Sequence, residues 1–131
     1  MPPDHPVTDL VSRVYPALAV GDKAAMQELL APDFVGRLAE GMPVGGGVHE
    51  GSQAMLDEGW WAIGREFAVR AEPDEFIPCA DGRLLVLGRY RGRRRDTDTE
   101  VDASFAHLWT AREGRLIAVV QVTDTASWSS S

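Results

Sequence analysis

The sequence predicts an α+β fold in which three N-terminal helices pack against a curved antiparallel β-sheet. Apolar residues recur at helical spacing through the first third of the chain. The last third has the alternation of three long strands separated by two tight turns. Both faces of those strands are apolar in the middle, so each face must be covered, one by the helices and the other most simply by a second subunit.

Composition limits the possible classes of function. The 131 residues suit a single domain spanning residues 1–131, and 44% hydrophobic with 25% charged residues is typical of a soluble globular protein. A net charge of −7 argues against a nucleic-acid partner. No apolar run is long enough for a membrane span and the N-terminus lacks a signal core, so we expect no membrane contact and a cytoplasmic protein. Cys79 cannot form an internal disulfide, and the unpaired spacing of His5, His49 and His107 predicts no metal site.

The first helix is predicted by apolar residues at three- and four-residue spacing. Pro16 lies within this pattern and predicts a kink or an early end, because it cannot donate to the carbonyl of Ser12. Gly21-Asp22 should end this helix and cap a second, short one. Ala31-Pro32 should end that second helix, and Phe34–Leu38 is a candidate short strand. The apolar positions of the first helix are Val7, Leu10, Val11, Val14 and Leu18.

A glycine-rich segment, Gly41–Gly51, separates this part from the third helix. It lacks the GK[ST] signature of a phosphate loop and is interpreted as a flexible loop at a pocket rim. Ser52 is a candidate cap for the third helix, whose apolar face includes Trp60. Phe67–Ile77 should open the sheet, with a turn or bulge at Glu72-Pro73-Asp74.

Turn lengths then predict the register of the last three strands, Arg83–Arg95, Thr99–Arg112 and Arg115–Trp128. A two-residue loop at Asp96-Thr97 pairs Arg93 with Glu100 and Arg91 with Asp102, which places opposite charges across the ladder. A two-residue loop at Glu113-Gly114 pairs His107 with Val120 and Ala103 with Asp124. One face of the sheet would therefore carry Tyr90, Ala103, Phe105, His107, Trp109 and Asp124.

We expect that face to line one enclosed pocket, closed by Tyr15 and Trp60 from the helices. Asp124 is the first candidate for acid/base catalysis, although it could instead cap the strand end. His107 is the second candidate, as a base or as a donor to a carbonyl, with a hydrogen-bonded core histidine as the alternative. Tyr90, Trp109 and Phe105 complete the predicted substrate contacts. The opposite face, with Leu85, Leu87, Leu108, Ile117 and Val119, predicts a homodimer.

Several segments together resemble the SnoaL-like polyketide cyclase family. They are LLAPDF at Leu29–Phe34, MPVGGGVHEG at Met42–Gly51, VLGRYRGR at Val86–Arg93, FAHLWTAREGRL at Phe105–Leu116 and TDTASW at Thr123–Trp128. The resemblance implies the nuclear-transport-factor-2-like (cystatin-like) α+β roll, a cone-shaped curved sheet wrapped around three helices. This superfamily also contains ketosteroid isomerase and limonene epoxide hydrolase, so the fold alone does not define the reaction.

The resemblance implies a cofactor-independent acid/base enzyme, of isomerase, cyclase or lyase type, that acts on a small apolar carbonyl compound. Asp124 matches the late-strand aspartate of the cyclases, and Tyr15 lies near the position of the isomerase's oxyanion-binding tyrosine. Two alternatives remain open: a non-catalytic binding or accessory protein, and an epoxide hydrolase. For the latter, Arg89-Tyr90-Arg91 lacks the aspartate of the hydrolase's Arg-x-Asp pair.

Overall fold

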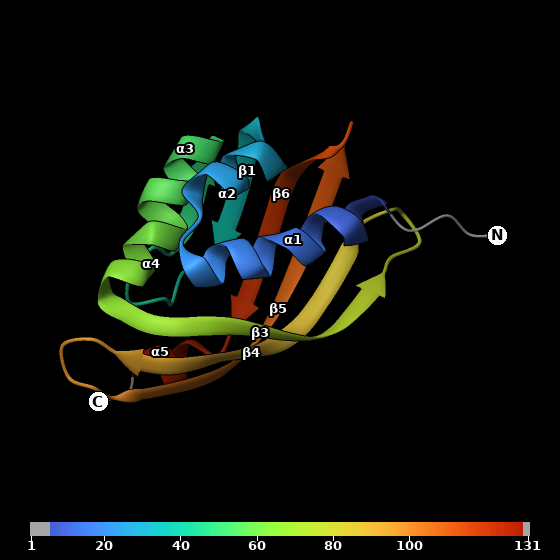
Figure 1. Ribbon diagram of the computed structural model, residues 1–131. Coiled ribbons are helices and arrows are strands. Elements are labelled where there is room, and N and C mark those ends of the chain that lie inside the picture. The colour runs from blue at the N-terminus through green and yellow to red at the C-terminus, as the bar shows by residue number, and fades with distance from the viewer. Residues whose placement is uncertain (1–5, 130–131) are drawn as a thin grey trace.

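The computed structural model describes residues 6–129, which form a single curved sheet with helices on its concave side (Figure 1). The six strands lie in the order β2-β1-β6-β5-β4-β3, and all neighbours are antiparallel except β1 and β6. The predicted α+β roll is therefore confirmed. The elements are α1 (Pro6–Val20), α2 (Lys23–Leu29), β1 (Leu30–Leu38), β2 (Gly47–Glu50), α3 (Ser52–Ala54), η1 (Met55–Trp60), α4 (Trp61–Glu66), β3 (Phe67–Pro78), β4 (Leu84–Arg94), β5 (Glu100–Arg112), β6 (Arg115–Thr123) and α5 (Thr125–Ser129).

The first helix continues through Pro16 and ends only at Val20, so the predicted early end is wrong. Pro16 and Ser12 both lie on the exposed side of the helix, where water can satisfy the carbonyl that proline leaves free. The predicted boundary between the first and second helices, at Gly21-Asp22, is correct. Gly21 adopts a left-handed φ of 70°, and the Asp22 carboxylate accepts from the Ala25 amide at 3.0 Å, which caps α2.

The segment after α2 is more regular than the sequence indicates. Strand β1 begins directly at Leu30, and part of the expected loop, Gly47–Glu50, forms an edge strand that pairs with β1. Gly51, not Ser52, occupies the cap position of the third helical segment, and no side chain caps it. That segment runs from α3 through the π-helical turn η1 into α4.

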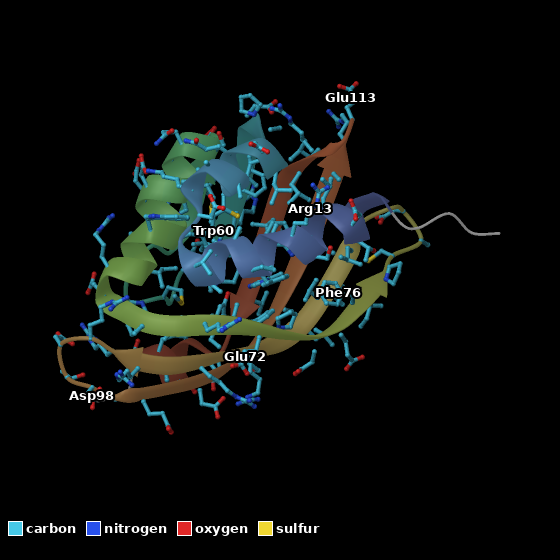
Figure 2. All side chains as sticks on the ribbon, in the orientation of Figure 1. Arg13, Trp60, Glu72, Phe76, Asp98 and Glu113 are labelled. Atoms are coloured by element: carbon cyan, nitrogen blue, oxygen red, sulfur yellow. The ribbon has the colours of Figure 1, made fainter. Side chains whose placement is uncertain are left out.

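The predicted β4–β5 register is confirmed, with Arg93 opposite Glu100 and Arg91 opposite Asp102. The turn is longer than expected, because β4 ends at Arg94 and β5 begins only at Glu100, so residues 95–99 connect them. The Arg94 amide still donates to the Thr99 carbonyl at 2.8 Å, as the predicted pairing requires. The hairpin tips at Asp98 and Glu113 lie at opposite ends of the sheet (Figure 2).

The ion pairs on this hairpin differ in part from the expected ones. Asp102 accepts from Arg89 at 2.7 Å and lies 3.9 Å from Arg91, so it is shared between two arginines. Arg93 pairs with Asp98 at 2.8 Å and not with Glu100. The left-handed φ of 62° at Asp98 belongs to the turn that allows this local contact.

The predicted β5–β6 register is wrong beyond the turn, because β6 contains a β-bulge at Ile117. Arg112 pairs with Arg115 and Ala111 with Leu116, but Thr110 then pairs with Ala118. One extra residue reverses the faces of everything that follows it on the bulged strand. His107 is therefore opposite Gln121 and not Val120.

Strand β6 also ends earlier than expected, at Thr123, and the following residues form the short helix α5. Asp124 precedes this helix, and its carboxylate accepts from the Ser127 hydroxyl at 2.8 Å. The predicted interruption of β3 is confirmed as a bulge, since Pro73 pairs with Gly88 and Glu75 with Leu87.

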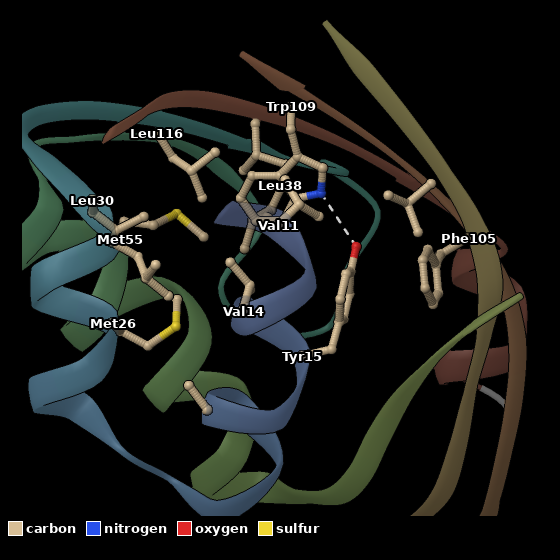
Figure 3. Packing of buried hydrophobic residues seen from close by; sticks show 14 of the residues in the cluster. Val11, Val14, Tyr15, Met26, Leu30, Leu38, Met55, Phe105, Trp109 and Leu116 are labelled. Atoms are coloured by element: carbon tan, nitrogen blue, oxygen red, sulfur yellow. Dashed lines mark hydrogen bonds between the residues drawn. The ribbon is translucent and has the colours of Figure 1, made fainter. Parts of the chain in front are cut away.

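The apolar core lies between the helices and the concave face of the sheet (Figure 3). Val11, Val14 and Tyr15 from α1 are buried against the sheet. The convex face stays apolar without a cover, with Val122 62% exposed. Val119, expected on that face, is buried inside because of the bulge. Among the described residues, no helix combines the length and apolar character needed to span a membrane.

Candidate functional site

A cavity of about 560 Å³ opens between the end of α1, the α4 helix and the concave face of the sheet. Its volume falls in the range typical of small-molecule sites. Strands β1 and β3 to β6, helices α1 and α4, the turn η1 and helix α5 contribute to the lining. Most of the walls are apolar or aromatic, and the polar groups gather in one place on the sheet side, around His107.

His107 lies between two tyrosines that come from different elements. Its Nδ1 is 2.7 Å from the Tyr15 hydroxyl of α1, and its Nε2 is 2.6 Å from the Tyr90 hydroxyl of β4. The three side chains are buried, and all three contribute to the cavity wall. Both ring nitrogens are thus engaged within the protein.

Each tyrosine hydroxyl also makes a second hydrogen bond, in which it is the acceptor. The Trp109 indole N–H donates to Tyr15 at 3.2 Å, as the dashed line in Figure 3 shows. The Gln121 side-chain amide donates to Tyr90 at 2.7 Å. The other end of that amide accepts from the Ala39 backbone N–H at 3.1 Å, which fixes its orientation.

A count of the protons in this network shows that one tyrosine O–H has no acceptor within it. A neutral imidazole has one N–H, so it donates to one tyrosine and accepts from the other. The tyrosine that accepts from His107 already accepts from Trp109 or Gln121 as well, so its own O–H is not used within the network. In either tautomer of His107, one phenolic proton remains available to a molecule in the cavity.

Burial keeps all three titratable groups of the network neutral. It lowers the pKa of His107 to about 3, far below its ordinary value. Burial also raises the pKa of Tyr15 and the pKa of Tyr90 above the usual tyrosine value, although hydrogen bonds from Trp109 and Gln121 oppose this. Among the described residues, no carboxylate lines the cavity and no cluster of possible metal ligands occurs.

Aromatic side chains form the walls around this network. Trp60 stacks on Trp109 with ring centroids 6.2 Å apart, and the adjacent Trp61 also lines the cavity. Two consecutive residues of a regular helix point about 100° apart. Trp60 and Trp61 lie where the π-helical turn η1 meets α4, and π-helical turns are often found at functional sites.

The structure brings together most of the residues predicted for the site. Tyr15, Trp60, Tyr90, His107 and Trp109 all line the cavity. Phe105 does not line it, and instead packs behind His107 with ring centroids 4.0 Å apart.

Asp124 lies outside the cavity, so its predicted position is wrong. The bulge at Ile117 removes it from the concave face, and it is exposed at the start of α5. Gln121, which lies opposite His107 in the ladder, is the β6 side chain that contacts Tyr90 on the cavity side, and sequence reasoning missed it. The available signal was a single amide side chain within the apolar run of β6.

Trp128 was also missed as a lining residue. It returns from α5 to the cavity and packs edge-on against Tyr90, with ring centroids 4.9 Å apart. Its indole N–H donates to the Thr123 hydroxyl at 3.1 Å, which ties α5 to the end of β6. The sequence indicated a strand here, so Trp128 could not be placed.

This fold, with its cavity between the helices and the concave face of the sheet, defines an α+β roll of the nuclear-transport-factor-2-like type. The model of the SnoaL-like domain matches residues 11–119, and the chain belongs to that family. The predicted resemblance is therefore confirmed. A search of the curated proteins gives no significant match.

Solved structures support the same assignment. An NTF2-like protein of unknown function from Burkholderia pseudomallei is 29% identical, with a TM-score of 0.80 over 91% of both chains. An NTF2-like protein from Burkholderia thailandensis is 25% identical, with a TM-score of 0.81 over 90% of both chains. A protein provisionally assigned as a polyketide cyclase, from Sinorhizobium meliloti, is 25% identical, with a TM-score of 0.70 over 87% of this chain and 94% of that one.

Proposed function

We propose that this protein catalyses keto–enol proton transfer, of the isomerase or cyclase type, on a small and largely apolar carbonyl compound without a cofactor. The observation that carries this proposal is the Tyr15–His107–Tyr90 network with its one unused phenolic proton. The family and the similarity to a provisionally assigned polyketide cyclase support the class of reaction.

The network can move a proton from one position of a ligand to another without forming an ion. Tyr15 gives its free proton to the carbonyl oxygen and takes the Nδ1 proton of His107. His107 takes the Tyr90 proton at Nε2, and Tyr90 takes the proton from the carbon next to the carbonyl. The electron pair of the broken C–H bond becomes the double bond of the enol. The result is the enol and the other tautomer of His107.

This route suits the electrostatics of the cavity. A buried imidazolium or phenolate would be costly where burial already shifts the pKa of each group toward its neutral form. A relay through His107 avoids both ions, and the aromatic walls exclude water from the developing charge. No step uses a carboxylate. The epoxide hydrolase alternative loses its support, since its catalytic aspartate has no counterpart among the described cavity residues.

Deuterium exchange of 2-tetralone in D₂O, followed by NMR, tests the proposal. We expect the protein to accelerate exchange at the carbons beside the carbonyl, and Tyr15→Phe to reduce the acceleration about 10²-fold, the scale of a lost acid/base group. Tyr15→Phe keeps the ring and removes one oxygen, so a circular dichroism spectrum like that of the parent checks its fold. Binding of 2-tetralone without any acceleration would favour the non-catalytic binding protein instead.

We further propose that the protein is a homodimer through the convex face of the sheet. Two rows of apolar side chains cross β4, β5 and β6 there. The first row is Leu85, Leu108 and Val120, and the second is Leu87, Ala106 and Val122. Val120 and Val122 are large, exposed hydrophobic residues on this face, which supports a second copy as its cover.

A further inference from the structure

The two tyrosine hydroxyls beside His107 accept unequal hydrogen bonds from the residues around them. The Gln121 amide donates to Tyr90 at 2.7 Å, at the short end of the usual range for an N–H donor to oxygen. The Trp109 indole donates to Tyr15 at 3.2 Å, at the long end of that range. Two donors on one hydroxyl oxygen compete for its electron density, so an oxygen with a short hydrogen bond is a poorer acceptor for a second. Tyr15 is therefore the better acceptor for the imidazole N–H.

The direction of the Gln121 contact is fixed by the backbone. An amide side chain accepts only through its oxygen, and the Ala39 N–H donates to that oxygen at 3.1 Å. The nitrogen must then be the end that faces Tyr90, where it can only donate. Gln121 is buried in β6, and Ala39 directly follows β1, so two paired strands hold this orientation.

With this starting point the hydrogen bonds can run in one direction through the site. Tyr90 donates its proton to Nε2 of His107, and the Nδ1–H of His107 donates to the Tyr15 hydroxyl. Each group then donates onward after accepting, and hydrogen bonds in such a series strengthen one another. The reverse direction would make Tyr90 accept from Gln121 and from His107 at once. In the favoured direction the series ends at Tyr15, whose own proton is left for the cavity.

We infer that Gln121 is a positioning residue, which holds His107 in the tautomer protonated at Nδ1 and so leaves the free phenolic proton on Tyr15 and not on Tyr90. Gln121 acts through Tyr90, and this role requires no contact between Gln121 and a ligand. The tautomer does not depend on any reaction. The use of the Tyr15 proton as an acid, by contrast, rests on the proposed function.

Nitrogen-15 NMR of the imidazole tests the inference on the parent protein, because a protonated and an unprotonated ring nitrogen differ widely in chemical shift. The His107 signals are those absent from the spectrum of His107→Phe. At pH 7 burial keeps this ring neutral, because its pKa is lowered to about 3. We expect the Nδ1–H form to exceed the Nε2–H form about tenfold, the scale of one net hydrogen bond. Equal amounts of the two forms, or an excess of the Nε2–H form, would overturn the inference whether or not any Gln121 variant folds.

Two variants then test whether Gln121 is the cause. Gln121→Met keeps an unbranched side chain but cannot donate, so the ratio should fall from about ten to one or below. Trp109→Phe is the matched control, because it removes the donor to Tyr15 from the same buried network and should keep the Nδ1–H excess. An unchanged ratio in Gln121→Met, or a similar fall in Trp109→Phe, would also overturn the inference. Exchange of 2-tetralone by the parent tests the proposed function separately, so either proposal can fail alone.

Discussion

Mild acid should destabilise this protein through His107. The side chain is buried, with both ring nitrogens engaged, and burial lowers its pKa to about 3. In the unfolded chain the pKa returns to the ordinary value of 6.5. Between these two values the unfolded state binds a proton that the folded state does not, so the free energy of unfolding falls as the pH falls.

The size of the effect follows from the two pKa values. The contribution is fully present above about pH 6.5 and is lost progressively toward pH 3. From pH 7 to pH 5.5 the linkage relation gives a loss of about 1.3 kcal/mol in the free energy of unfolding. This window lies above the ordinary pKa values of carboxyl groups, about 3.9 to 4.3, so protonated histidine accounts for the change.

Urea denaturation at pH 7 and pH 5.5, on the parent and on His107→Phe, measures this loss. The variant keeps a ring of similar size but cannot titrate, so its pH dependence should be smaller by the same amount, whatever its absolute stability. An NMR titration of the parent is independent of the variant's folding. Equal pH dependence in parent and variant, or a His107 imidazole that titrates near pH 6.5 in the folded protein, would refute the reasoning.

Three further changes test other parts of the structure. Gln121→Leu should lower the free energy of unfolding by about 1–3 kcal/mol in urea denaturation, because it leaves the half-buried Ala39 amide without its acceptor and removes the donor to the buried Tyr90 hydroxyl; a change below 0.5 kcal/mol would contradict the network. Asp124→Asn should leave 2-tetralone exchange at the parent rate, since Asp124 lies outside the cavity; a loss of exchange would restore its predicted acid/base role. Val122→Asp should convert the proposed dimer into a monomer in sedimentation velocity, and a parent that is already monomeric at micromolar concentration would refute the dimer.

The sequence was sufficient for the fold and for one side of the site. The β4–β5 register followed from the assumed turn position, with charge pairing in its support, and placed Tyr90 and His107 correctly on the concave face. The resemblance to the family singled out Tyr15 on the first helix, where it is buried. These features depend on local pattern and on one hairpin, which a sequence records directly.

The β6 side of the site depends on the β-bulge at Ile117, which the sequence indicates only weakly. The run Ile117-Ala118-Val119-Val120 is apolar at every position, so it fits either register equally well. Only packing against the helices selects the register that buries Leu116, Val119 and Gln121 together. Strand β2 was missed for a related reason, because its pairing with β1 depends on tertiary contacts and not on its glycine-rich composition.

The bulge also determines which chemistry the cavity can support. In an unbroken ladder, Asp124 would face Tyr90 across Ala103, and the site would hold a carboxylate base. With Ile117 inserted, a neutral amide from Gln121 contacts Tyr90, and the described cavity residues contain no acid. Without a carboxylate, a buried histidine gains nothing from becoming charged, and both tyrosines retain their protons. Catalysis in such a site must therefore pass protons between neutral groups, which is what the alternation of tyrosine, histidine and tyrosine permits.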